Sequence, residues 1–117
     1  MNFKNFLRKI PIIRRIYPSI FTKCCKIIHK VDFTYKFREA FLNLNIHEPI
    51  DKSILLFNYY EDKQINYFLN YIKGNKVDYM LDVGANSGVY SLIIAQKFKK
   101  LKILSFEPIK KTFLKLR

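Results

Sequence analysis

Residues 77–106 alternate between short apolar runs and a glycine-containing loop, and this alternation constrains the fold more than any other part of the sequence. The run VDYMLDV predicts a short buried strand. Gly84–Gly88 predicts a turn, and Val89–Ala95 predicts an apolar helix followed by lysines, which are favourable at a helix C-terminus. The run KILSF, residues 102–106, predicts a second strand. A strand, a helix and a second strand in this order predict an α/β fold with a parallel sheet and a right-handed crossover.

The flanking segments complete this pattern. Residues 61–74 predict a helix that begins with two acids, ends at a glycine and carries an apolar face of Ile65, Phe68, Leu69 and Ile72. The preceding run Ser53–Tyr60 is apolar and aromatic, and fits either a strand or a buried connector. Residues 109–117 predict a last helix whose buried side would be Phe113 and Leu116.

Residues 1–48 are basic, aromatic and helical in pattern. Apolar residues share one helical face on either side of two prolines: Phe3, Phe6, Leu7 and Ile10 before Pro11, and Ile20, Cys24, Ile27, Ile28 and Val31 after Pro18. Two interpretations stay open, a pair of helices packed on a domain and an amphipathic segment on an anionic membrane surface. Short apolar faces interrupted by proline favour the first. We therefore expect a basic helical segment at 1–48 and a second domain at 49–117.

The charge is strongly positive, with 22 Lys and Arg against 9 Asp and Glu and a net charge of +13. Such a chain attracts nucleic acid, anionic lipid or acidic substrates. The basic residues are scattered, however, and the many Lys, Asn, Ile, Phe and Tyr residues are what AT-rich coding produces. The charge therefore predicts no specific nucleic-acid partner.

Cysteine and histidine usage predicts no metal site. Cys24 and Cys25 are adjacent, which disfavours a disulfide between them, and His29 and His47 are isolated. Free thiols fit a reducing compartment, where we expect both cysteines to act as small core residues. No apolar run reaches membrane-spanning length, and we expect a cytoplasmic protein.

The candidate site lies where the two predicted strands end. Asp82 and the Gly84–Gly88 loop follow the first strand, and Glu107 follows the second. Ligands of open parallel sheets bind at the carboxyl ends of the strands. Glycines let the backbone approach a ligand closely, and a carboxylate at the next strand can accept hydrogen bonds from both hydroxyls of a ribose. The pattern therefore predicts a cofactor that contains a nucleoside.

Two cofactor types fit this arrangement. A nicotinamide dinucleotide usually takes G-x-G-x-x-G, whereas this loop reads G-A-N-S-G and has an acid, Asp82, two residues before its first glycine. That acid is unfavourable beside a pyrophosphate. S-adenosylmethionine has no phosphate and carries an ammonium group, so the charge at Asp82 favours S-adenosylmethionine.

The stretches LDVGANSGVYSL and ILSFEP resemble motif I and the following acidic motif of class I S-adenosylmethionine-dependent methyltransferases, in particular the FkbM-type family. That family has D-V-G-A-N-x-G at its first strand and F-E-P at its second, and YYED before the preceding helix is weakly similar to its lead-in. The resemblance implies that Gly84 and Gly88 shape the cofactor loop, which Ala85 and Asn86 line. It also implies that Asp82 approaches the methionine part and that Glu107 holds the ribose hydroxyls.

The resemblance further implies a Rossmann-like, doubly wound parallel sheet of seven strands, of which residues 77–106 would form the first two. We therefore expect an N-terminal portion of a methyltransferase, from a truncated gene, a split frame or a partial record, with weak catalysis or none. The implied reaction is O-methyl transfer to a hydroxyl of a sugar, glycan or small molecule. No catalytic residue can be named, and Tyr90 and Ser91 are expected to pack or cap. A non-catalytic remnant and an NAD(P)-binding oxidoreductase remain alternatives.

Overall fold

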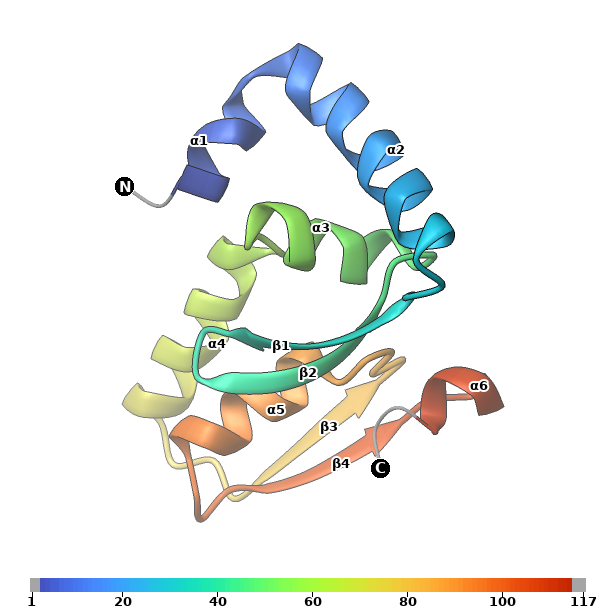
Figure 1. Cartoon of the computed structure of the whole chain (residues 1–117). Coiled ribbons are helices and arrows are strands. Elements are labelled where there is room, and N and C mark those ends of the chain that lie inside the picture. The colour runs from blue at the N-terminus through green and yellow to red at the C-terminus, as the bar shows by residue number, and fades with distance from the viewer. Residues whose placement is uncertain (1–2, 115–117) are drawn as a thin grey trace. The chain divides into compact units, whose positions relative to one another are not determined.

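The computed structural model describes the backbone of residues 3–114, with side chains except those of residues 3, 5 and 6 (Figure 1). Leu116, expected on the buried side of the last helix, lies outside the described residues. In chain order the elements are α1 (Phe3–Lys9), α2 (Pro11–Ile27), β1 (Asp32–Phe37), β2 (Ala40–Asn45), α3 (Pro49–Phe57), α4 (Asp62–Gly74), β3 (Tyr79–Val83), α5 (Val89–Lys97), β4 (Lys102–Phe106) and α6 (Lys110–Phe113). The described chain is a mixed α/β structure with two two-stranded sheets, of which β3–β4 is parallel.

The chain forms two compact units. One unit comprises the residues up to Tyr35 together with Asn43–Tyr60, and the other comprises Lys36–Leu42 and the residues from Glu61 on. The β1–β2 hairpin is therefore divided, because its tip groups with the second unit and the outer ends of its strands with the first.

The hairpin corrects the expectation that the helical pattern extends to residue 48. Residues 32–45 form β1 and β2 instead, and polar and apolar residues alternate along β1 and along the second half of β2. Arg38 lies in the turn with φ of 52°. Its guanidinium donates to the Asp62 carboxylate at 2.9 Å and to the Asn66 side chain at 2.8 Å, and these bonds hold the turn on α4.

Helix α3 occupies the run that was expected to be a strand or a buried connector. Pro49 begins the helix, where its missing N–H costs nothing, and Asn58 ends it in the left-handed region at φ 51°. The helix is buried over much of its length, at Asp51, Ile54, Leu55, Leu56 and Phe57. Asp51 accepts a hydrogen bond from the Asn45 backbone N–H at 2.9 Å, which ties the start of α3 to the end of β2.

Helix α2 also differs from the expectation, because Pro18 does not interrupt it. The helix continues from Pro11 to Ile27, and Pro18 removes only the one backbone hydrogen bond that its N–H would have made. Thr22 Oγ donates to the Pro18 carbonyl at 2.7 Å. The face expected to pack after Pro18 is exposed at Ile20, Cys24, Ile27 and Ile28.

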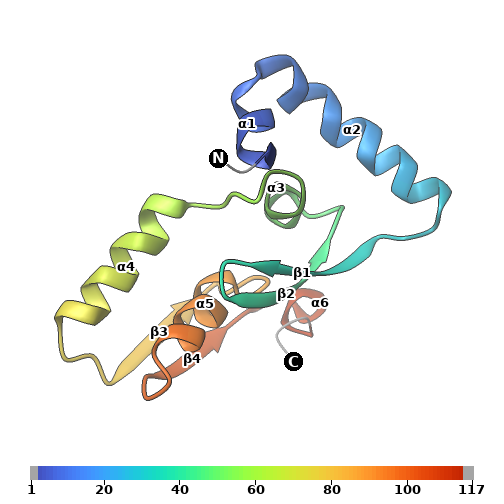
Figure 2. The same cartoon turned by 60° about the vertical axis from the view of Figure 1, so that its left-hand side comes forward.

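In the second unit, α4 confirms the expected helix, with Ile65 and Leu69 of its apolar face buried, whereas Phe68 of that face is 43% exposed. The expected parallel pairing is also confirmed, since Asp82 pairs with Ser105 and Val83 with Phe106 in the β3–β4 register. Figures 1 and 2 both show α5, the crossover helix, over one face of this sheet.

The other face of the β3–β4 sheet is apolar and exposed. Its side chains are each more than half exposed: Tyr79, Leu81, Val83, Leu104 and Phe106. Parallel sheets are normally covered on both faces. Phe113, expected to be buried, is 39% exposed, and no described residue of α6 is buried. Within residues 3–114, every helix is too short or too polar to cross a bilayer.

Two single-thiol variants test the packing of α2. Cys25 is buried and Cys24 is exposed, so only one of the two is the expected small core residue. Burial raises the pKa of the Cys25 thiol, and the neighbouring Cys24 raises it further. Because the thiolate is the reactive form, we expect Cys24→Ala, which retains Cys25, to react with Ellman's reagent at least about tenfold more slowly near neutral pH than Cys25→Ala.

In concentrated guanidinium chloride both variants should react at the same rate, because burial is then lost. Equal rates in the folded protein would contradict the packing described for α2.

Candidate cofactor site

The loop between β3 and α5 is held in a left-handed backbone conformation at three positions. Gly84, Asn86 and Gly88 have φ of 79°, 50° and 75°. Only glycine adopts such angles freely, so the two glycines are required by the path of the chain. The Gly84 and Ala85 amides both donate to the Phe106 carbonyl, at 2.8 and 3.0 Å, and tie the loop to the end of β4.

Glu107 lies directly against this loop. One carboxylate oxygen accepts the Asn86 backbone N–H at 2.9 Å, and the other accepts the Ile109 N–H at 2.8 Å. Each oxygen can accept a second hydrogen bond, so the two amides orient the carboxylate and leave it able to accept hydrogen bonds from a ligand. The structure thus brings together the loop and the acid that the sequence predicted to share one sheet edge.

Asp82 points toward α5 and belongs to a chain of hydrogen bonds. Ser91 Oγ donates to Asp82 Oδ2 at 2.5 Å and lies 2.7 Å from Ser105 Oγ. Because Ser91 has one hydroxyl proton, Ser105 must be the donor to Ser91. The chain links β4, α5 and β3. Ser91 is buried, so it packs, as expected, rather than caps the helix, and its hydroxyl fixes the Asp82 carboxylate.

Ser87 is a residue of the loop that sequence reasoning missed, since it occupies the variable position of D-V-G-A-N-x-G. Its side chain is 2% exposed, and its hydroxyl has no hydrogen-bond partner among the described residues. A buried unsatisfied hydroxyl is unfavourable by about 1–3 kcal/mol unless something binds to it. No pattern in the sequence distinguishes it from a solvated loop serine.

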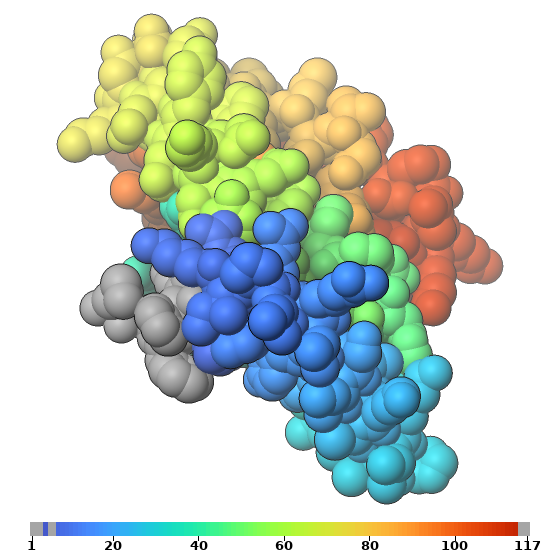
Figure 3. Space-filling view, turned by 90° about the horizontal axis from the view of Figure 1, so that it is seen from above, coloured from blue at the N-terminus to red at the C-terminus, as the bar shows by residue number. Residues whose placement is uncertain are grey.

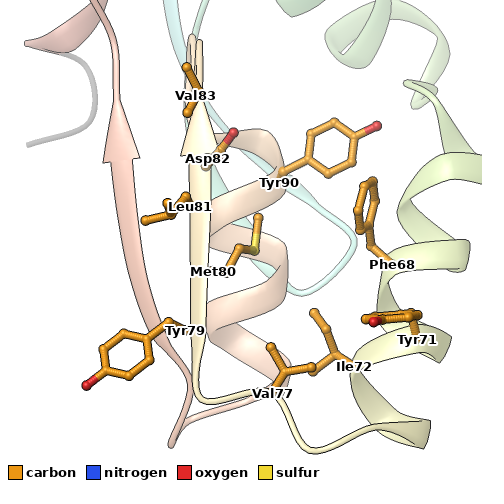
Figure 4. A pocket seen from close by; sticks show the side chains of 10 residues that line it. All are labelled: Phe68, Tyr71, Ile72, Val77, Tyr79, Met80, Leu81, Asp82, Val83 and Tyr90. Atoms are coloured by element: carbon orange, nitrogen blue, oxygen red, sulfur yellow. The ribbon is translucent and has the colours of Figure 1, made fainter.

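A cavity of about 500 Å³ lies beside Asp82, between β3 and α4 (Figure 4). Its lining is largely apolar: Phe68, Tyr71, Ile72, Val77, Tyr79, Met80, Leu81, Val83 and Tyr90 surround it with Asp82. Figure 4 shows the side chains of Phe68, Met80 and Tyr90 directed toward the same space. Tyr90 meets Phe68 edge-on, with ring centroids 5.7 Å apart, and its hydroxyl donates to Glu61 at 2.5 Å.

The site therefore combines a glycine loop, two carboxylates on neighbouring strand ends and an apolar cavity. The carboxylates can accept hydrogen bonds from hydroxyl or ammonium groups, and the cavity suits an apolar or planar group. His29 and His47 belong to the other unit, and neither lines the cavity. Among the described residues, no cluster of His, Cys, Asp and Glu could hold a metal ion.

No protein-family model, curated protein or solved structure matches this chain. The resemblance to FkbM-type methyltransferases consequently rests on the residues of the two motifs.

Two glycine variants test whether the left-handed backbone angle at Gly84 makes an added Cβ unfavourable, since the space around both glycines is open. Gly84→Ala places a Cβ in open space but at φ 79°, so we expect it to lower the free energy of unfolding by about 1–2 kcal/mol through strain alone. Gly74→Ala, also in open space and at the end of α4, should be neutral or stabilise by up to about 1 kcal/mol. Urea unfolding measures both, and equal effects would contradict the loop conformation.

Ser91→Ala tests the hydrogen-bond chain. It removes the donor to Asp82 and leaves Ser105 without its acceptor, so we expect a loss of about 1–3 kcal/mol in the free energy of unfolding. Ser105→Ala retains the bond from Ser91 to Asp82 and serves as the matched control, with a smaller loss. A larger effect of Ser105→Ala would show that the chain is not organised around Ser91.

Proposed function

We propose that the loop from Gly84 to Gly88, with Asp82 and Glu107, binds S-adenosylmethionine as part of an FkbM-type methyltransferase with a Rossmann-like, doubly wound sheet. One observation carries the proposal. The Glu107 carboxylate lies within hydrogen-bonding distance of the glycine loop, 2.9 Å from the Asn86 amide nitrogen, at the shared carboxyl edge of two parallel strands.

The residues present fit this cofactor in three respects. Glu107 is oriented by two backbone amides and retains acceptor capacity for ribose hydroxyls. The bond from Ser91 uses one oxygen of Asp82, so the other would accept from an ammonium group or a bridging water. The buried Ser87 hydroxyl supplies a further polar group in the loop.

When bound, S-adenosylmethionine supplies an electrophilic methyl group, and the motif resemblance favours a hydroxyl of a sugar, glycan or small molecule as its acceptor. The contribution of the described residues is to bind and orient: Glu107 and Asp82 would position polar groups, and the apolar cavity beside Asp82 would hold an apolar or planar group. We assign no general base. A cytoplasmic location remains a prediction from the two free thiols.

Two other functions would use the same scaffold. An NAD(P)-binding oxidoreductase shares the strand–loop–helix arrangement, but Asp82 and the missing third glycine disfavour a pyrophosphate over this loop. A non-catalytic remnant would retain the loop without its ligand. Binding measurements on the full chain distinguish the three.

Isothermal titration calorimetry with S-adenosylhomocysteine and with NADH tests the proposal. We expect binding of S-adenosylhomocysteine only, and a loss of affinity of about tenfold or more in Glu107→Gln, because a charged acceptor for the ribose hydroxyls is removed. Asp78→Asn removes an exposed carboxylate just before β3, at the far end from the loop, and should leave the affinity unchanged.

Binding of NADH alone would establish the oxidoreductase alternative, and binding of neither ligand would establish the remnant. Equal affinity losses in the two variants would remove Glu107 from the site. Thermal unfolding of both variants serves as the folding control.

A further inference from the structure

Helix α2 has two apolar faces, and only one of them is packed. On the inner face, the Tyr17 ring lies 6.3 Å from the Phe21 and Phe57 rings, and Cys25 is buried. The outer face carries four isoleucines that are 50–77% exposed: Ile12, Ile16, Ile20 and Ile27. Their spacings of four, four and seven residues place them in one stripe along the helix. Because α2 continues through Pro18, this isoleucine stripe extends over almost the whole helix.

Basic side chains lie within and beside the stripe. Lys23 follows Ile20 by three residues and precedes Ile27 by four, so helical geometry puts it on the same face, and Arg15 follows Ile12 by three. Within residues 3–114, no ion pair involves Arg14, Arg15, Lys23 or Lys26. The outer side of α2, blue to cyan, can be followed in Figure 3.

The sequence around the helix is free of negative charge. Residues 1–31 contain eight Lys or Arg residues and no Asp or Glu. The positive charge of this segment is therefore not offset by any acidic residue within it, although basic residues occur throughout the chain. An acid-free segment with an apolar stripe is complementary to a surface that is both anionic and apolar.

A basic hollow lies at the start of this helix. Arg8, Lys9, Arg14 and Arg15, with Pro11, line a space of about 350 Å³. The Arg8 guanidinium lies 3.5 Å from the centroid of the Tyr59 ring, which holds it at the edge of the hollow. Arginines recognise phosphate through paired hydrogen bonds, so the hollow suits a lipid phosphate group.

We propose that the isoleucine stripe of α2 and the basic hollow bind the surface of membranes rich in anionic phospholipid. The helix would lie in the plane of the interface, with its isoleucines among the acyl chains and its cations at the headgroups. A second copy of the chain does not fit as the occupant, since two acid-free segments would repel each other. Nucleic acid would engage the cations but leave the stripe in water. No residue of this surface belongs to the proposed cofactor site, so either proposal can fail without the other.

Vesicle co-flotation of the full chain tests this surface. We expect binding to phosphatidylcholine vesicles that contain about a quarter phosphatidylglycerol to be at least about tenfold stronger than binding to phosphatidylcholine alone, and to weaken as salt is raised.

Paired substitutions assign the binding to α2. Ile16→Asn with Ile20→Asn should lower binding by about tenfold or more, because both side chains lose their insertion into the interface. Arg15→Gln with Lys23→Gln should lower binding by about thirtyfold, because each cation contributes about fivefold. Lys110→Gln with Lys111→Gln makes the same charge change at exposed positions of α6 and should alter binding by less than about threefold.

Several outcomes would overturn the proposal. These are equal binding to neutral vesicles, equal losses in the α2 and α6 charge variants, and no loss in the isoleucine variant. Self-association in the absence of lipid that the isoleucine variant abolishes would assign the stripe to a second copy. Salt-dependent DNA binding that needs the cations but not the isoleucines, with no vesicle binding, would assign the surface to nucleic acid. All substituted side chains are exposed, and circular dichroism confirms that each variant is folded.

Discussion

Parallel pairing between β3 and β4 brings the carboxyl ends of two strands to one edge, and the candidate site depends on it. The register opposes Val83 to Phe106, so the next residues of both strands leave the sheet at the same level. The Phe106 carbonyl then accepts two loop amides, and Glu107 accepts a third from Asn86. A shift of register would separate these groups, since each residue advances the strand by about 3.3 Å.

The two carboxylates of the site are oriented by hydrogen bonds that use only part of their acceptor capacity. Glu107 is oriented by two amides, and Asp82 is oriented by Ser91, yet both carboxylates retain acceptor capacity. The Ser105–Ser91–Asp82 chain fixes Asp82 from the covered side of the sheet, and the apolar cavity lies beside it. Orientation before binding lowers the entropy lost when a ligand is held, which is why such scaffolding favours binding.

Local sequence signals predicted the elements from α4 to β4 well and the elements before α4 poorly. The elements from α4 to β4 follow from periodicity, glycines and charges close in sequence, and the parallel pairing of β3 with β4 follows from the helix that lies between them in the sequence. The β1–β2 hairpin was missed because its turn contains Arg38 rather than a glycine or asparagine, and contacts with α4 compensate. Helix α3 was ambiguous because a short buried apolar run has no period. The partnerless hydroxyl of Ser87 depends on packing that no sequence pattern reports.

The division of the hairpin between the two units limits how recombination between genes could transfer one unit without the other. Its tip, Lys36–Leu42, groups with the residues from Glu61 on, so the backbone passes from one unit to the other three times. A segment beginning at Glu61 would lose Arg38, whose guanidinium bonds to Asp62 and Asn66. No single recombination point can therefore transfer either unit intact, and gene duplication or fusion would have to carry both together as one exchangeable module.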